Sequence, residues 1–356
     1  MKEKYQNIGR LMDNEIKEVV GCTEPASIAY AFSTALAELK KNTGKDINIK
    51  NIKASGKFSK DVFRNVSTVK IPAIKVKGAK AAAASGLMLK NSSLNMFRDF
   101  NRDSQEHAVR LINKNGWYKG GPLNREGLFV EAELSWGNDT VRVVIEDEHD
   151  FIKTINHNGK TIYRGKIREN NAGKLFGGGL KDIAAVALEA PQSLISRVKY
   201  FLNEQGKNVE KHQYSNCRDG VKDLTLRRME GESIKIMTIT GSGNQGIFLG
   251  VPLYMLYKRE GDKFLPAVLF AILTQLYLAF EKGRISGICG LANKAALSLA
   301  AGLTYYREKG KKNRIKENME LVDETLRGMI CEGAKKSCAL KAVAAFVAVE
   351  EVAKGI

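Results

Sequence analysis

Cysteine, histidine, proline and tryptophan are all scarce in this 356-residue sequence, which has five, four, six and two of them. With no apolar segment of signal-peptide length at the N-terminus and an odd number of cysteines, we do not expect a disulfide framework, and we expect reduced thiols in the cytoplasm. The longest apolar run, residues 265–280, is short for a membrane span and contains Thr274 and Gln275. We therefore expect a buried helix there and no contact with a membrane.

Acidic residues are also few, because 39 Asp and Glu stand against 57 Lys and Arg, a formal charge of +18. Clustered basic residues are typical of nucleic-acid binding, but here they are spread along the chain, and the densest group is 307–316. The sequence contains neither zinc-finger spacing nor an RNA-binding aromatic motif. We interpret the charge as a solvated basic surface, with a nucleic-acid-binding protein that has buried thiols as an alternative.

The hydrophobic patterns predict an α+β fold in which a mostly helical part, 1–45 and 236–356, encloses an inserted α/β segment, 46–235. Glycine-bounded apolar patterns predict the helices, and alternating or β-branched stretches predict the strands. The expected helices are 12–20, 25–41, 80–89, 181–206, 252–258, 265–282, 290–307, 315–330 and 338–353, and the expected strands are 47–52, 128–134, 140–145 and 234–239. Residues 135–139 are expected to join the second and third of these strands as a hairpin. A homo-oligomer is compatible with this organisation.

Cys22 lies at a break between two predicted helices, in the stretch Gly21-Cys22-Thr23. A helix N-terminus exposes N–H groups and carries partial positive charge, which lowers the pKa of a thiol. This placement predicts thiolate chemistry or metal ligation at Cys22. The alternative is a small buried residue at a helix junction.

Three further cysteines lie in the helical C-terminal third, each at or near a predicted helix break that contains glycine: Cys289, Cys331 and Cys338. Ligands at helix breaks can converge, and adjacent glycines let backbone N–H groups approach a sulfide cluster. None of the four histidines is close to these cysteines in sequence, and no close pair of cysteines typical of zinc sites is present. The spacing alone leaves an iron–sulfur site, a zinc site and buried thiols open.

Four segments in one order carry a resemblance to a known family: GCTEP at 21–25, GSGNQG at 241–246, RISGICG at 284–290 and MICEGAKKSCALK at 329–341. They are similar to the signature segments of the L-cysteine desulfidase and iron–sulfur L-serine dehydratase α-chain family, and they span nearly the whole chain. The resemblance implies a cytoplasmic lyase with a 4Fe-4S cluster. Such an enzyme converts L-cysteine to pyruvate, ammonia and sulfide, or L-serine to pyruvate and ammonia.

Carried over residue by residue, the resemblance makes Cys289, Cys331 and Cys338 the cluster ligands. Cys22 matches the N-terminal cysteine of the family, which is either a fourth ligand or a catalytic thiolate. A small amino-acid substrate would be held by the polar and basic residues of the same segments and of 59–72: Thr23, Arg64, Asn65, Ser242, Asn244, Gln245, Lys335 and Lys341. The purely structural alternatives are a tight turn at 241–246 and solvated lysines near helix ends.

The chain departs from the family pattern at 66–70, where Val66, Thr68 and Lys70 replace expected glycines. Side chains at these positions forbid the close backbone approach that glycine allows. We therefore expect either a substrate other than cysteine and serine, or a cluster-binding relative without catalysis. A pyridoxal phosphate enzyme could perform the same reaction, but no lysine here has a context specific to a Schiff base.

Overall fold

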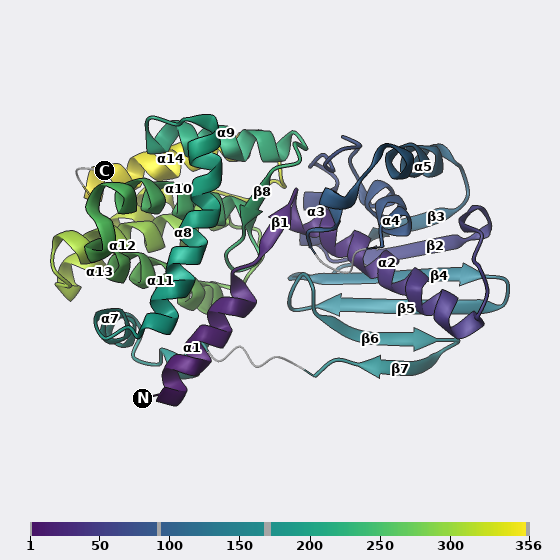
Figure 1. Cartoon of the computed structure of the whole chain (residues 1–356), viewed down its shortest axis with the longest axis horizontal. Helices are drawn as coiled ribbons and strands as arrows, with labels where there is room; N and C mark the ends of the chain where they lie inside the picture. Colours follow the sequence, from purple (N-terminus) through teal and green to yellow (C-terminus); the bar gives the residue numbers. More distant parts are fainter. Residues whose placement is uncertain (1, 91–93, 167–171, 354–356) are drawn as a thin grey trace.

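A computed structural model describes residues 2–90, 94–166 and 172–353. It has two halves side by side, one helical and one built on a sheet (Figure 1). A short antiparallel ribbon of β1 (Glu18–Val20) and β8 (Lys235–Met237) lies between them. The predicted α+β class is confirmed.

The sheet has six strands in the order β3-β2-β4-β5-β6-β7, and only the β2–β3 pair is parallel. The strand bounds are β2 Lys53–Phe58, β3 Tyr118–Pro122, β4 Phe129–Trp136, β5 Asp139–Glu146, β6 Ile152–His157 and β7 Lys160–Arg164. The predicted hairpin at 135–139 is present, with Trp136 opposite Asp139. Gly137 adopts a φ of 59° in its two-residue turn, a conformation that glycine reaches without steric cost.

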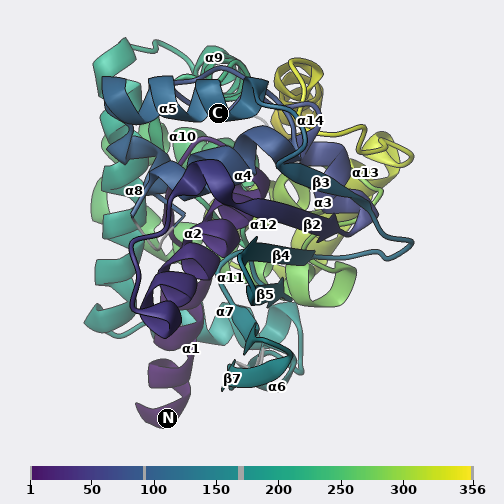
Figure 2. The same ribbon diagram turned by 90° about the vertical axis from the view of Figure 1, so that its right-hand side faces the viewer.

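Helices cover one face of this sheet, as the view turned by 90° also shows (Figure 2). α2 packs against β4, β5 and the alanine-rich α4, and α4 packs against α5. Small side chains on α4 let these helices approach closely. The bounds are α2 Thr23–Thr43, α3 Lys60–Val66, α4 Ala79–Met88 and α5 Arg102–Asn113, with 3-10 turns at Ile49–Asn51 and Met96–Asp99.

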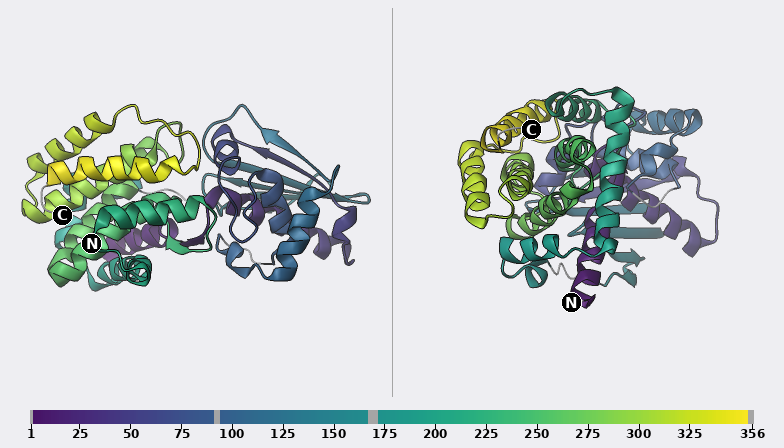
Figure 3. Two further views of the ribbon diagram at one scale, coloured as in Figure 1. Left: turned by 90° about the horizontal axis from the view of Figure 1, so that it is seen from above. Right: turned by 60° about the vertical axis from the view of Figure 1, so that its left-hand side comes forward.

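The other half is a bundle around the apolar α10 and α11 (Figure 3). α8 packs against α10 and α11, α9 packs against α10 and α14, and α12 packs against α11, α13 and α14. The helices are α1 Lys2–Glu15, α6 Ala172–Leu175, α7 Leu180–Leu188, α8 Gln192–His212, α9 Cys217–Met229, α10 Gly243–Glu260, α11 Leu265–Lys282, α12 Ala296–Arg307, α13 Lys312–Leu326 and α14 Ser337–Ala353, with a 3-10 turn at Gly261–Phe264 and a π-turn at Leu291–Ala295.

The continuous helical stretch Gly243–Lys282 is long and apolar enough to cross a membrane by length and composition. Its most apolar window is 78% buried inside the molecule, as in the core helix of a soluble protein. The helix predicted at 265–282 is thus α11, and it lies in the core.

Three local predictions are wrong. Residues 18–20, expected to be helical, form β1 because pairing with β8 overrides local propensity. The strand expected at 47–52 lies instead at Lys53–Phe58, after a 3-10 turn. The helix expected at 181–206 is divided at Pro191, which begins α8 and disfavours helix in the residue before it.

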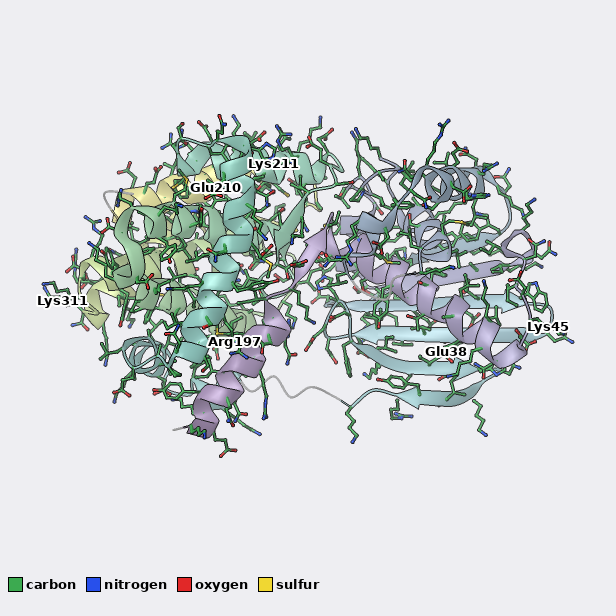
Figure 4. The ribbon with its side chains drawn as sticks, viewed as in Figure 1. Glu38, Lys45, Arg197, Glu210, Lys211 and Lys311 are labelled. Carbon is green, nitrogen blue, oxygen red and sulfur yellow. The ribbon has the colours of Figure 1, made fainter. Side chains whose placement is uncertain are left out.

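The packing also distributes the elements differently from the expected division of the chain. α2 lies on the sheet, whereas α8 and α9, within the expected inserted segment 46–235, pack in the helical bundle. Many basic side chains point outward over both halves, as Lys45, Lys211 and Lys311 illustrate (Figure 4). Some of them are paired, such as Arg197 of α8 with Asp13 of α1.

Candidate active site

A cavity of about 100 Å³, the size of a small molecule, lies where the two halves meet. Both halves supply its walls. The sheet half contributes Cys22, Thr23, Glu24, Asn65 and His149, and the helical half contributes Arg228, Thr240, Gly241, Ser242, Asn244, Gln245, Arg284, Ile285, Ser286, Ile288, Cys289, Gly290, Leu291, Lys294, Cys331, Gly333, Ala334 and Cys338.

Cys289 and Cys331 are held next to each other by a short antiparallel bridge between Ile288 and Ile330. The N–H of Cys289 donates to the carbonyl of Met329 at 2.9 Å, and the N–H of Cys331 donates to the carbonyl of Gly287 at 2.7 Å. The bridge therefore fixes two cysteines that are distant in sequence. Both line the cavity.

Cys338 reaches the same cavity from the start of α14, and its Sγ lies 3.6 Å from the carbonyl oxygen of Gly333. Gly333 has a φ of 102°, and a Cβ there would fall 2.6 Å from Oγ1 of Thr68. Only glycine satisfies both constraints. The turn between Cys331 and Cys338 thus depends on Gly333.

Within the described ranges, no group of three or more His, Cys, Asp and Glu side chains could hold a single metal ion. This finding gives no support to a zinc site. In an iron–sulfur cluster each thiolate binds a different iron, so its ligands need not converge on one point. Three thiols on one wall of a cavity fit that requirement.

Lys294 adds a buried cation to this wall, at 1% exposure. Its Nζ donates to the carbonyl of Gly283 at 2.8 Å. Burial lowers the pKa of Lys294 to about 8, and the neighbouring Cys289 and Cys331 act in the opposite direction. Anionic thiolates or an anionic cluster would favour the charged form of Lys294. The three cysteines and this lysine therefore fit an iron–sulfur cluster.

Cys22 is the N-cap residue of α2. Its thiol is 3% exposed, and Sγ donates to Oε2 of Glu24 at 3.0 Å. Burial, followed by the charge of Glu24, raises the pKa of Cys22 far above its usual range, and Arg228 offsets only part of this. The prediction of a lowered thiol pKa is wrong, because desolvation outweighs the helix terminus.

Glu24 connects Cys22 to two other residues of the sheet half. Its Oε1 accepts from Nδ2 of Asn65 at 2.8 Å and lies 3.8 Å from Nε2 of His149. Burial alone would raise the pKa of Glu24, but His149 and the Cys22 hydrogen bond hold it well below the usual range. A buried carboxylate at the cavity wall is therefore ionised.

His149 reaches the cavity from the loop between β5 and β6 and is 6% exposed. Its Nε2 has no hydrogen-bond partner among the described residues. Gly241, with a φ of 76°, makes room for the ring, because a Cβ there would fall 2.6 Å from Nδ1 of His149. Ion pairs on either side, Lys17 with Asp150 and Arg284 with Glu148, hold this loop against the helical half.

A buried polar network behind the cavity fixes Gln245. Gln275 donates through Nε2 to Oε1 of Gln245, and it accepts from the hydroxyl of Ser298 at 3.1 Å. With its oxygen occupied, Gln245 presents its Nε2 toward Gly290, where a Cβ would fall 2.4 Å from that nitrogen. The glycine beside Cys289 thus leaves space for an amide donor.

Five of the eight residues predicted to bind substrate line the cavity: Thr23, Asn65, Ser242, Asn244 and Gln245. The structure does not bring the other three to it. Arg64 pairs with Asp61, Lys335 is exposed, and Lys341 donates to the carbonyl of Ile330. Ser242 caps α10 by accepting from the N–H of Gln245, which agrees with the alternative of a turn that satisfies its own backbone.

Sequence reasoning missed the charged residues of the cavity: Glu24, His149, Arg228, Arg284 and Lys294. Glu24 and Arg284 lie within the segments GCTEP and RISGICG, so these motifs could have identified them as site residues. His149 and Arg228 are isolated in sequence. Only the fold brings them to the site.

The segment that departs from the family pattern also borders the site. Val69 is fully buried and packs with Cys22, Met229 and Ala334, and Cys338 packs against this cluster. None of Val66, Thr68 and Lys70 has a positive φ. The backbone at these three positions is therefore compatible with side chains, and the segment contacts two of the site cysteines through Val69.

The chain matches the model of the serine dehydratase alpha chain family over residues 74–354. It belongs to this family. A UPF0597 protein of Thermosipho melanesiensis is 32% identical, covering 92% of this chain and 83% of the relative. UPF0597 proteins of Thermosipho africanus and Clostridium perfringens strain SM101 are 31% and 28% identical, with 93% and 96% of this chain covered and 84% of each relative. No solved structure matches.

Membership of the serine dehydratase α-chain family confirms the resemblance inferred from the four segments. The match covers three of them in full and most of the chain. GCTEP, with Cys22 and Glu24, lies before residue 74 and is connected to the matched region through the cavity.

Proposed function

We propose that this protein is an iron–sulfur-dependent lyase that eliminates the β-substituent of a small L-amino acid, L-cysteine or L-serine. One observation carries the proposal: Cys289, Cys331 and Cys338 line the same small cavity as the Cys22–Glu24 pair. Membership of the serine dehydratase α-chain family agrees with this chemistry.

Cys289, Cys331 and Cys338 would hold the 4Fe-4S cluster, and Lys294 would offset part of its negative charge. When bound through only three thiolates, such a cluster supplies a Lewis-acidic iron for the leaving sulfur or oxygen. The N–H groups of Cys289 and Cys331 donate to the carbonyls of Met329 and Gly287 across the Ile288–Ile330 bridge, which holds the two cysteines in place.

Cys22, Glu24 and His149 would move the proton. The thiol proton of Cys22 points at Glu24 Oε2, and Glu24 Oε1 faces His149 Nε2. A proton that leaves Cys22 can be held on the carboxylate and imidazole, and the resulting thiolate can accept the proton on Cα of the substrate. Asn65 keeps Glu24 in position through its 2.8 Å hydrogen bond.

Loss of the Cα proton and of the β-substituent leaves aminoacrylate, with sulfide or water as the departing group. Aminoacrylate rearranges to the imine, which water hydrolyses to pyruvate and ammonia. No net oxidation occurs. The chain's task is therefore to bind the amino acid, remove one proton and exclude side reactions.

The test is pyruvate release from L-cysteine and L-serine by protein purified and reconstituted without oxygen. Wild-type protein should release pyruvate, and C331A, which removes one thiolate, should not. Bound iron with no pyruvate from either amino acid would favour the second candidate, a cluster-binding relative with another substrate. The contacts of the altered 66–70 loop with Cys22 and Cys338 favour that candidate.

We place the enzyme in the cytoplasm, where all five of its cysteines, each free in the structure, would stay reduced.

A further inference from the structure

Arg228 is a buried cation that makes no ion pair with any residue the structure describes. It lies near the end of α9, is 2% exposed and lines the cavity. Its Nε donates to the carbonyl of Gly21 at 3.0 Å, and its Nη1 donates to Oδ1 of Asn244 at 2.7 Å. Both acceptors are neutral, and Nη2 has no acceptor among the described residues.

The surroundings do not neutralise this charge. Arg284, the other guanidinium of the cavity, is paired with Glu15. Glu24 is the one carboxylate that lines the cavity within the described residues, and its oxygens are engaged by Cys22, Thr23 and Asn65. A buried charge that lacks a partner is costly, so the cavity favours an anionic ligand.

The glycine-rich segment 241–246 is shaped around this side chain. A Cβ on Gly243 would fall 2.5 Å from Cδ1 of Ile236 and 2.6 Å from both Cζ and Nε of Arg228. The guanidinium therefore rests directly on the backbone at the start of α10, and any other residue at 243 would push against both it and Ile236. Asn244, the next residue, holds its Nη1. The segment thus positions a planar donor group toward the cavity.

We propose that Arg228 binds the α-carboxylate of the substrate and so restricts the enzyme to free amino acids. The assignment rests on the proposed function. A guanidinium presents N–H groups in the plane that suits a carboxylate. Arg228 stands beside Cys22, since it donates to the carbonyl of Gly21, so a carboxylate bound there brings Cα close to the proposed base.

Lys294, the second buried cation without a carboxylate partner among the described residues, has a different place. It shares a turn with Cys289 and Gly290, and its Nζ is directed to the carbonyl of Gly283. Its charge would offset thiolates at Cys289 and Cys331. Lys294 therefore lies on the cysteine side of the cavity, and Arg228 lies on the side proposed to bind the substrate carboxylate.

The test compares 3-mercaptopropionate with 3-mercaptopropionamide, which differ only in the carboxylate, by calorimetry on anaerobically reconstituted protein. Wild-type protein should bind the acid about 10- to 100-fold more tightly than the amide, the range of a hydrogen-bonded charge. R228Q should bring this ratio close to one. R227Q is the matched control, because Arg227 is paired with Asp223 and Glu232, and it should keep the wild-type ratio.

An unchanged ratio in R228Q, or no preference for the acid in wild-type protein, would overturn the assignment. If R228Q does not fold, G243A serves instead, because it displaces the guanidinium while retaining the arginine; its ratio should also fall. Wild-type protein that binds the acid through Arg228 but releases no pyruvate would refute the proposed lyase and leave the carboxylate site standing.

Discussion

The thiol of Cys22 donates a hydrogen bond to Glu24, with Sγ and Oε2 separated by 3.0 Å, inside a wall closed to solvent. The pair shares one proton between a thiol whose pKa is raised and a carboxylate whose pKa is lowered. In the free protein the proton therefore rests on sulfur. Binding of a substrate or a cluster must shift it before Cys22 can act as a base.

The first prediction concerns stability and pH. The pKa of Glu24 is lowered from a usual value of 4.5, so its ionised form contributes stability that is present above about pH 4.5 and is lost as pH falls below it. The difference in unfolding free energy between wild-type protein and E24Q should shrink on acidification from pH 6 toward pH 2. Denaturant unfolding at several pH values measures it. A difference independent of pH would show that Glu24 is not held ionised.

The second prediction separates the two roles open to Cys22. If Cys22 transfers a proton and is not a ligand, C22S should retain its iron and sulfide but lose about 100-fold or more of its activity, as expected for a missing general base. Metal analysis and pyruvate release are measured on the same preparation. Loss of the iron in C22S would instead make Cys22 a cluster ligand.

The third prediction tests how His149 is placed. G241A introduces a methyl group 2.6 Å from His149 Nδ1, whereas G283A introduces one at a similar φ, 77°, with no atom within 4 Å. Both variants should lose about 1 kcal/mol of stability from the left-handed backbone. Only G241A should also lose most of its kcat. Equal kcat values in the two variants would remove His149 from the proton pathway.

The fourth prediction uses the two glycines that flank Ile288 and Cys289. A Cβ at Gly290 would fall 2.4 Å from Gln245 Nε2, but a Cβ at Gly287 meets nothing within 4 Å. G290A should therefore raise KM or reduce cluster content, and G287A should resemble wild-type protein. Iron content and steady-state kinetics distinguish these effects. Indistinguishable variants would mean that the Gln245 amide has no role in the cavity.

The sequence predicted the α+β class, most of the long helices and the β4–β5 hairpin, because apolar period and turn residues are local signals. It did not predict β1, which exists through its pairing with β8, or the division of the predicted helix at Pro191. For the site, glycine and cysteine motifs located Cys22, Cys289, Cys331 and Cys338 around one cavity.

The charged residues of the site could be identified only from the fold. Arg228 comes from the last turn of an ordinary polar helix, and His149 comes from an acidic loop, so neither has a pattern that a sequence alone can interpret. The raised pKa of Cys22 likewise depends on burial by Val69 and Met229, which are 47 and 207 positions away along the chain. The local sequence indicates the helix terminus at Cys22, but it does not indicate the desolvation of the thiol.

The most direct test of the central claim is the iron and acid-labile sulfide content of anaerobically reconstituted protein, with C331A and C217A alongside. Cys217 is a half-buried thiol near Met255, outside the cavity, and is the matched control. We expect about four irons and four sulfides per chain in wild-type protein and C217A, as in a 4Fe-4S cluster, and a large loss in C331A. Wild-type protein without iron, or equal iron in C331A and C217A, would contradict the account.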